Sequence, residues 1–158
     1  MKSKTWVLRH KNDQFVKRAK QLGYINRAAF KLEEIEKKYG IIKKSKDILE
    51  LGSSPGGWTQ VIINSNISSN ITCFDLLDMK IKNNRINFFK KDFLSYNFKN
   101  KNVRFDLILS DLAPNTTGHK STDHLKISQM IFEIINILDS TIKNKGWFIF
   151  KIWKGEEE

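Results

Sequence analysis

The stretch that decides the fold is ILELGSSPGGW, residues Ile48–Trp58, in which a short apolar run gives way to a turn rich in glycine. A strand followed by glycines that let the backbone approach a ligand is how an open α/β sheet forms a nucleotide pocket. The GxGxxG spacing is absent, and no Lys-Ser/Thr pair follows at the Walker spacing. The turn therefore predicts a nucleoside-like ligand without a triphosphate. A plain strand-to-helix turn is the alternative, because glycine and proline punctuate most connections.

Apolar runs and helical patterns alternate after this stretch begins. Strands are predicted over five ranges: 47–51, 71–75, 86–89, 105–110 and 147–152. Helices are predicted over 57–64 and about 123–142, and the second carries an apolar face made of Ile127, Ile131, Ile134 and Leu138. Strands that alternate with helices pair in parallel through right-handed crossovers. The pattern predicts one α/β domain with a Rossmann-like sheet.

A lysine lies beside the apolar face of a further predicted helix, NRAAFKLEEIEKKYG, with Asn26 as its N-cap and Gly40 as its stop. Residues at helical spacing form its apolar stripe: Ala28, Leu32, Ile35 and Tyr39. Lys31 lies at the flank of that stripe and is predicted to face inward more than a solvated lysine does. Two interpretations stay open for it, a functional group or a stem that covers apolar surface while its amine reaches water.

Positive charge is concentrated in the amino-terminal part of the chain. The net charge is +11, and residues 1–46 hold fourteen Lys and Arg against four Asp and Glu. Residues 47–158 hold fourteen against thirteen. A basic segment of this kind is the electrostatic footprint of phosphate-backbone binding. A lysine-rich composition is the alternative, but it leaves the near-neutral remainder unexplained.

Composition limits the class of protein. A length of 158 residues with 40% hydrophobic content suits one domain with a single core. The longest apolar runs fall far short of the ~18 residues of a membrane span, and no apolar signal region follows the first lysines. Cys73 is the single cysteine and cannot form an internal disulfide, so a reducing, cytoplasmic compartment is expected. The histidines are scattered and predict no metal site: His10, His119 and His124.

Four charged side chains follow predicted strands, at the edge where open α/β sheets bind ligands: Asp75, Asp92, Asp111 and Lys151. Asp75 fits the acidic residue that binds ribose hydroxyls. Asp92 fits either an adenine amino group or an exposed turn. Asp111 and Lys151 each follow a nearly unbroken apolar strand, where a lone charge is costly, and adjacent strands would let them pair. They are candidates for catalysis, and an ion pair that only fixes the sheet is the alternative.

Six blocks occur in the order and rough spacing of one family: RAAFKLEEI, LELGSSPGGW, FDLLDM, KKDF, LILSDLAPN and FIFKIWKGE. From about Trp6 to Glu156 the chain resembles the FtsJ (RrmJ) type ribosomal RNA 2′-O-ribose methyltransferases. Its basic opening is similar to that family's amino terminus. The resemblance implies an S-adenosylmethionine-dependent methyltransferase fold, with a mostly parallel sheet between helices. It implies methylation of a ribose 2′-hydroxyl of ribosomal RNA, expected in the large subunit, with that RNA or a ribosomal subunit as the partner.

The resemblance implies one domain over 1–158, with a basic RNA-contacting extension and helix over 1–46 and a cofactor-binding sheet over 47–158. It also implies a cofactor site for S-adenosyl-L-methionine, made of Gly52, Ser53, Ser54, Pro55, Gly56, Gly57, Trp58, Asp75, Leu76, Asp92, Phe93 and Asp111. Asp75 would lie near the ribose, Asp92 near the adenine and Asp111 beside the sulfonium. Lys31, Asp111 and Lys151 match the first three members of the family's Lys-Asp-Lys-Glu catalytic set. Lys151 corresponds to the residue that accepts the hydroxyl proton.

Two departures from the family keep other functions open. The family continues past the fifth strand with a helix and two strands that carry its catalytic glutamate, and Glu156 does not match that glutamate. We therefore expect a sheet without the last strands. Separately, we expect a monomer. Glu50 stands where the family usually has aspartate. A shortened, non-catalytic relative that binds RNA or ribosomes is one alternative. A cap-directed 2′-O-methyltransferase is another, although nothing marks an aromatic cap pocket.

Overall fold

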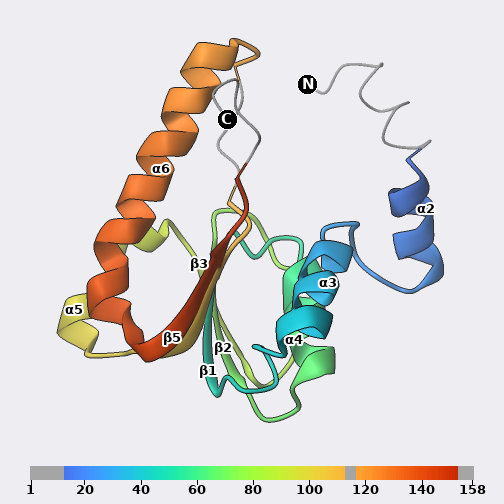
Figure 1. Cartoon of the computed structure of the whole chain (residues 1–158), viewed down its shortest axis with the longest axis horizontal. Coiled ribbons are helices and arrows are strands. Elements are labelled where there is room, and N and C mark those ends of the chain that lie inside the picture. The colour runs from blue at the N-terminus through green and yellow to red at the C-terminus, as the bar shows by residue number, and fades with distance from the viewer. Residues whose placement is uncertain (1–12, 113–116, 153–158) are drawn as a thin grey trace.

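Figure 1 shows a computed structural model of the chain, which describes residues 13–112 and 117–152. Five strands form one sheet in the order β3-β2-β1-β4-β5, and every neighbouring pair is parallel. Their bounds are β1 Asp47–Leu51, β2 Asn70–Asp75, β3 Ile86–Lys90, β4 Phe105–Ser110 and β5 Ile142–Phe150. The order reverses between β1 and β4, which is where such sheets bind ligands. The predicted Rossmann-like α/β fold is confirmed.

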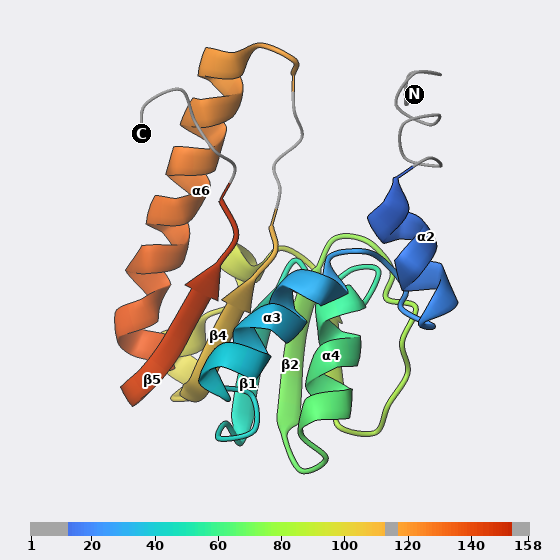
Figure 2. The ribbon, with the colours of Figure 1, turned by 45° about the vertical axis from the view of Figure 1, so that its right-hand side comes forward.

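Helices cover both faces of the sheet (Figure 2). The helices α3 (Ala29–Tyr39) and α4 (Gly57–Ser65) lie on one face, and α5 (Phe98–Lys101) and α6 (Lys120–Thr141) lie on the other. A short helix, α2 (Gln14–Gln21), stands beside the end of the sheet to which the strands point, and a 3-10 turn, η1 (Phe93–Ser95), follows β3. None of the described helices is long and apolar enough to cross a membrane.

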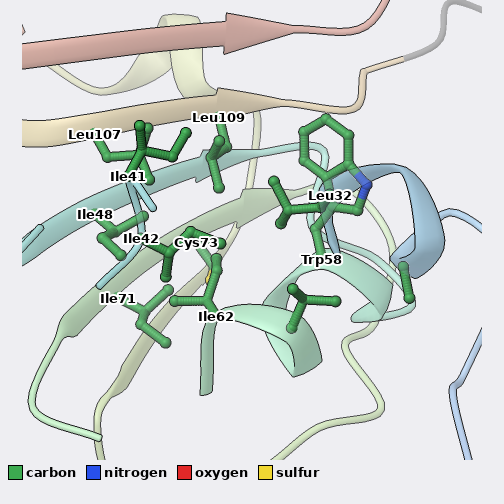
Figure 3. Close-up of a cluster of buried hydrophobic side chains, with 12 residues drawn as sticks. Leu32, Ile41, Ile42, Ile48, Trp58, Ile62, Ile71, Cys73, Leu107 and Leu109 are labelled. Carbon is green, nitrogen blue, oxygen red and sulfur yellow. The ribbon is translucent and has the colours of Figure 1, made fainter. Parts of the chain in front are cut away.

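Alternation along the strands divides the core into two clusters. Ile48, Cys73 and Leu109 face α3 and α4, and Figure 3 shows them gathered with Leu32 and Trp58. The strand residues that alternate with these point to the other face of the sheet. There they join side chains of α5 and α6 in a second cluster, which includes Leu49, Leu51, Phe74, Ile108 and Ile134. A period of two with both sets buried is typical of a parallel sheet that is covered on both faces. The predicted apolar face of α6 is confirmed, because Ile127 and Ile134 are buried.

The helix α3 begins later than predicted. Asn26 is not its N-cap, because the helix starts at Ala29 and the Asn26 carboxamide accepts a hydrogen bond from Ala28 N inside the preceding turn. Gly40 ends the helix in a left-handed conformation, as predicted. Tyr39 is exposed and does not belong to the buried stripe. Glu36 is buried in its place, because its carboxylate accepts hydrogen bonds from Ile42 N and Lys43 N and so folds the chain back after α3.

The strand β5 begins at Ile142, five residues before its predicted start, and ends at Phe150. Lys143 explains the early start, since its Nζ lies 2.7 Å from Asp47 Oδ2 and 3.1 Å from Asp106 Oδ1. This contact holds the first residues of β5 against β1 and β4. Sequence patterns also missed α2 and α5. The Ala-Pro-Asn part of the LILSDLAPN block, Glu156 and residues 1–12 lie outside the described residues.

Candidate active site

An ion pair lies at the ends of two adjacent strands. Asp111 follows β4 and Lys151 follows β5, and the parallel register that pairs Ser110 with Phe150 brings the two residues together. Lys151 Nζ donates a hydrogen bond to Asp111 Oδ1. Their backbones continue the sheet, because Asp111 N bonds to Leu51 O and Lys151 N to Ser110 O. The predicted pairing of Asp111 and Lys151 is confirmed.

The pair is only partly open to solvent. The Asp111 side chain is 17% exposed and that of Lys151 is 36% exposed. Burial raises the pKa of Asp111, and the hydrogen bond and charge of Lys151 oppose that rise. The partly buried hydrogen bond holds the two side chains in a defined position. Such a pair is suited to hold and move a proton.

A cavity of about 520 Å³ lies beside this pair. It is lined by Gly52, Ser54, Phe74, Asp75, Leu76, Leu77, Lys91, Asp92, Phe93, Leu94, Asp111, Leu112, Met130 and Glu133. This volume lies within the usual range for small-molecule sites, roughly 300–1,000 Å³. Seven of the residues that the sequence assigned to a cofactor line it: Gly52, Ser54, Asp75, Leu76, Asp92, Phe93 and Asp111. The lining does not include Ser53, Pro55, Gly56, Gly57 or Trp58.

Asp75 joins two loops at the rim of the cavity. Its carboxylate accepts hydrogen bonds from Ser54 N and Leu77 N, each at 2.8 Å. It thus ties the turn after β1 to the loop after β2. Each carboxylate oxygen has a second lone pair, so Asp75 retains the capacity to accept a bond from a ligand hydroxyl.

Gly52 forms a floor that a side chain would fill. Its φ is +77°, and a Cβ built there would lie 2.9 Å from Leu112 N. Glycine is therefore required both by the left-handed backbone and by the close approach of Leu112. Glycine is required at position 57 for a different reason, because a Cβ there would lie 2.0 Å from the side-chain oxygen of Asn26. This glycine lets the chain that leads into α3 approach the first turn of α4.

Trp58 is a core residue in this structure. It is 3% exposed, and its Nε1 donates a hydrogen bond to Ala28 O at 2.9 Å. The indole therefore links α4 to the start of α3. Ser53 is also buried, whereas Ser54 lies at the rim and its hydroxyl donates to Asp78 O.

Lys31 does not face inward as predicted. Its side chain is 69% exposed, and Nζ lies 3.5 Å from Glu34 Oε2 on the same helix. Among the contacts of the described residues, none joins Lys31 to Asp111 or Lys151. The buried stripe of α3 runs through Ala29, Leu32 and Glu36, and Lys31 lies off that stripe in solvent.

Sequence reasoning missed part of the cavity wall. Met130 and Glu133 come from the middle of α6, Leu112 follows β4, and Lys91 precedes Asp92. The approach of Met130 and Glu133 depends on how α6 crosses the sheet, which no local motif encodes. Two of these residues carried a local signal, since Lys91 lies in the KKDF block and Leu112 in the LILSDLAPN block. Among the described residues, no group of three or more His, Cys, Asp or Glu side chains could hold a metal ion.

A buried carboxyl lies beneath the turn that follows β1. Glu50 is 1% exposed, and its Oε2 accepts a hydrogen bond from Thr59 Oγ1 at 2.6 Å. Cys73 Sγ lies 3.7 Å from the same oxygen. Burial raises the pKa of Glu50 to about 8, although the Thr59 and Cys73 hydrogen bonds oppose the rise. The carboxyl is thus mostly protonated at neutral pH and links β1 to the first turn of α4.

Comparisons with known proteins agree with this geometry. The profile of the FtsJ-like methyltransferase family matches residues 24–158. Two curated relatives carry the name Ribosomal RNA large subunit methyltransferase E. One, from Ehrlichia chaffeensis, is 39% identical over 100% of this chain and 77% of its own length. The other, from Novosphingobium aromaticivorans, is 35% identical over 97% of this chain and 71% of its own length.

Solved structures of methyltransferases also resemble this chain. A ribosomal RNA methyltransferase from Plasmodium falciparum superposes with a TM-score of 0.75 at 30% identity, covering 85% of this chain and 81% of that one. An O-methyltransferase family protein from Burkholderia thailandensis is 13% identical with a TM-score of 0.52, over 78% and 37% of the two chains, and shares the fold alone. The family profile, the curated relatives and the sheet order together place this chain in the FtsJ-like methyltransferase family.

Proposed function

We propose that this protein transfers a methyl group from S-adenosyl-L-methionine to a ribose 2′-hydroxyl of ribosomal RNA, in the large subunit and in the cytoplasm. The observation that carries the proposal is the Asp111–Lys151 pair beside a cavity of nucleoside size. A carboxylate and an amine at the edge of a cofactor pocket are the groups that a hydroxyl nucleophile requires. The names of the relatives supply the class of RNA.

The lining of the cavity fits the methyl donor. Asp75 would hold the ribose hydroxyls, Asp92 and Phe93 the adenine, and Asp111 the region of the sulfonium, over the floor that Gly52 forms. When bound, the donor supplies an electrophilic methyl group on a positively charged sulfur. A larger residue at position 52 would displace Leu112, which also lines the cavity, since the space for its Cβ is already occupied by the Leu112 backbone.

Lys151 accepts the proton of the ribose hydroxyl in this proposal. A 2′-hydroxyl is a poor nucleophile that must lose a proton and be aligned with the bond that breaks, so positioning supplies much of the rate. Lys151 Nζ is held by Asp111, a residue that lines the cavity, so the position of the amine is defined. Lys151 must first lose a proton to solvent, because an ammonium has no lone pair. Asp111 then stabilises the ammonium that forms again when the hydroxyl proton arrives. Lys31, on the exposed side of α3, would contact the RNA strand near the reacting sugar.

Residues 1–46 form the RNA-contacting part of the single domain in this proposal. Among the described residues, α2 and the chain that follows it carry Lys17, Lys20 and Arg27 beside the end of the sheet where the site lies. Lys17 and Lys20 are exposed. Exposed lysines that neutralise phosphates make binding dependent on salt, because they release counterions.

The test of the proposed function is a methylation assay on ribosomal particles with methyl-labelled S-adenosylmethionine. Label recovered in alkali-resistant dinucleotides is expected, because a 2′-O-methyl group blocks cleavage at that linkage. Label in alkali-sensitive nucleotides would indicate base methylation and would contradict the proposal. Binding of particles without any label would favour the non-catalytic relative instead.

Removing two charges from α2 is expected to weaken RNA binding. In the double variant Lys17→Ala/Lys20→Ala, the slope of log affinity against log salt should fall by about one to two units, since each lost phosphate contact removes about 0.7–0.9. Fluorescence anisotropy with a labelled fragment of large-subunit RNA at several salt concentrations measures the slope.

A matched control removes the same charge elsewhere. Lys99 and Lys101 are exposed on α5, which lies on the other side of the sheet from α2 (Figure 1). Lys99→Ala/Lys101→Ala should leave the slope unchanged if α2 contacts RNA. Equal effects of the two double variants would indicate a response to net charge alone and would contradict an RNA surface at α2.

A further inference from the structure

Glu133 lines the cavity, yet no motif or family resemblance assigns it a role. It lies in the middle of α6, on the face of the sheet opposite α3 and α4 (Figure 2). Among the described residues, its carboxylate accepts a hydrogen bond from Gln129 Nε2 at 3.3 Å, one turn earlier on the same helix. That partner is neutral, so it does not cancel the charge of Glu133.

The other carboxylates of the lining have local partners that hold them. Asp75 accepts two backbone N–H groups, Asp92 accepts Leu94 N at 3.0 Å, and Asp111 pairs with Lys151. Lys91 is the one cation in the described lining, and its Nζ lies 5.0 Å from the centre of the Tyr96 ring. Lys151 balances Asp111, so three carboxylates and one amine, Glu133 among them, leave the wall of the cavity with a net negative charge.

We propose that Glu133 is a specificity-determining residue that favours the charged methyl donor over the spent product. This inference rests on the proposed function. Methyl transfer breaks the bond from sulfur to the methyl carbon, forms a bond from the ribose oxygen to that carbon, and leaves the electron pair on sulfur. The sulfonium therefore becomes the neutral thioether of S-adenosylhomocysteine, while the rest of the ligand is unchanged. A carboxylate in a partly dehydrated cavity attracts the sulfonium and has no comparable attraction for the thioether.

The consequence for the reaction cycle is selective release. Donor and product share adenine, ribose and amino acid groups, so contacts to those groups bind both ligands equally. A fixed charge on the wall distinguishes them because charge is what the reaction changes. Glu133 thereby lowers product inhibition without contacting the RNA.

The test measures the dissociation constants of S-adenosylmethionine and S-adenosylhomocysteine by isothermal titration calorimetry. Glu133→Gln keeps the shape of the side chain and removes its charge. We expect the preference for the methionine ligand to fall by about 3- to 10-fold, mostly through weaker donor binding, and to fall less at high salt. Lys91→Met removes the opposite charge and should raise the same preference.

Asp139→Asn is the matched control, because Asp139 is an exposed carboxylate on α6 that does not line the cavity. It should leave the preference unchanged. An unchanged preference in Glu133→Gln, or equal weakening of both ligands, would overturn the inference while leaving the proposed function intact. A wild-type protein that binds neither ligand would overturn the proposed function, and this inference with it.

Discussion

Lys151→Ala is expected to reduce methyl transfer by at least about 10³-fold while changing the affinity for S-adenosylmethionine by less than about 3-fold. A positioned general base contributes roughly 10²–10⁴-fold, and the variant also leaves the Asp111 carboxylate without its partner. The lysine does not line the cavity, so binding of the donor is expected to persist. Single-turnover methylation with saturating donor, together with calorimetric binding, separates the two effects.

Lys151→Arg distinguishes a proton acceptor from a structural cation. Arginine can keep the ion pair with Asp111 but cannot deprotonate in a protein. We expect this variant to fold and bind the donor normally and to be as inactive as the alanine variant. A methylation rate near that of the wild type would show that Lys151 acts only through its charge, and would contradict its role as proton acceptor.

Glu50→Gln is expected to change how stability depends on pH. The pKa of Glu50 is about 8 in the folded chain and about 4.3 when unfolded, so the folded state retains a proton that the unfolded state has lost. The free energy of unfolding should therefore fall by about 1.4 kcal/mol per pH unit across this window and level off above pH 8. Glutamine removes this contribution and can still accept the Thr59 hydrogen bond.

The difference between variant and wild type isolates the Glu50 contribution from all other titrations. Between pH 6 and pH 8, Glu50→Gln should gain about 2–3 kcal/mol relative to the wild type, as measured by urea denaturation at each pH. Glu34→Gln is the control, because the Glu34 side chain is 71% exposed and its charge is solvated. Parallel pH profiles of Glu50→Gln and wild type would show that Glu50 is ionised in the folded protein.

Much of the sheet and part of the site could be predicted because their signals are local. Consecutive residues form the strand β1 and the turn at Gly52, and a nearly unbroken apolar run marks β4. Parallel strands bring their ends to one edge, so Asp111 and Lys151 were predicted to pair from topology alone. The start of β5 at Ile142 was not predicted, since it depends on Lys143 reaching Asp47 and Asp106 across the sheet.

The sequence by itself determined the order of the elements, the glycine turn and the carboxylates that follow the strands, because each depends on neighbours along the chain. Only the tertiary structure decided which side chains share the cavity. The crossing of α6 brings Glu133 to the wall, and the rotation of α3 about its axis leaves Lys31 in solvent. Helix crossing and rotation are set by the packing of apolar residues that are distant in the sequence, such as Leu32 against the sheet. The spacing of residues in a local motif does not determine that packing.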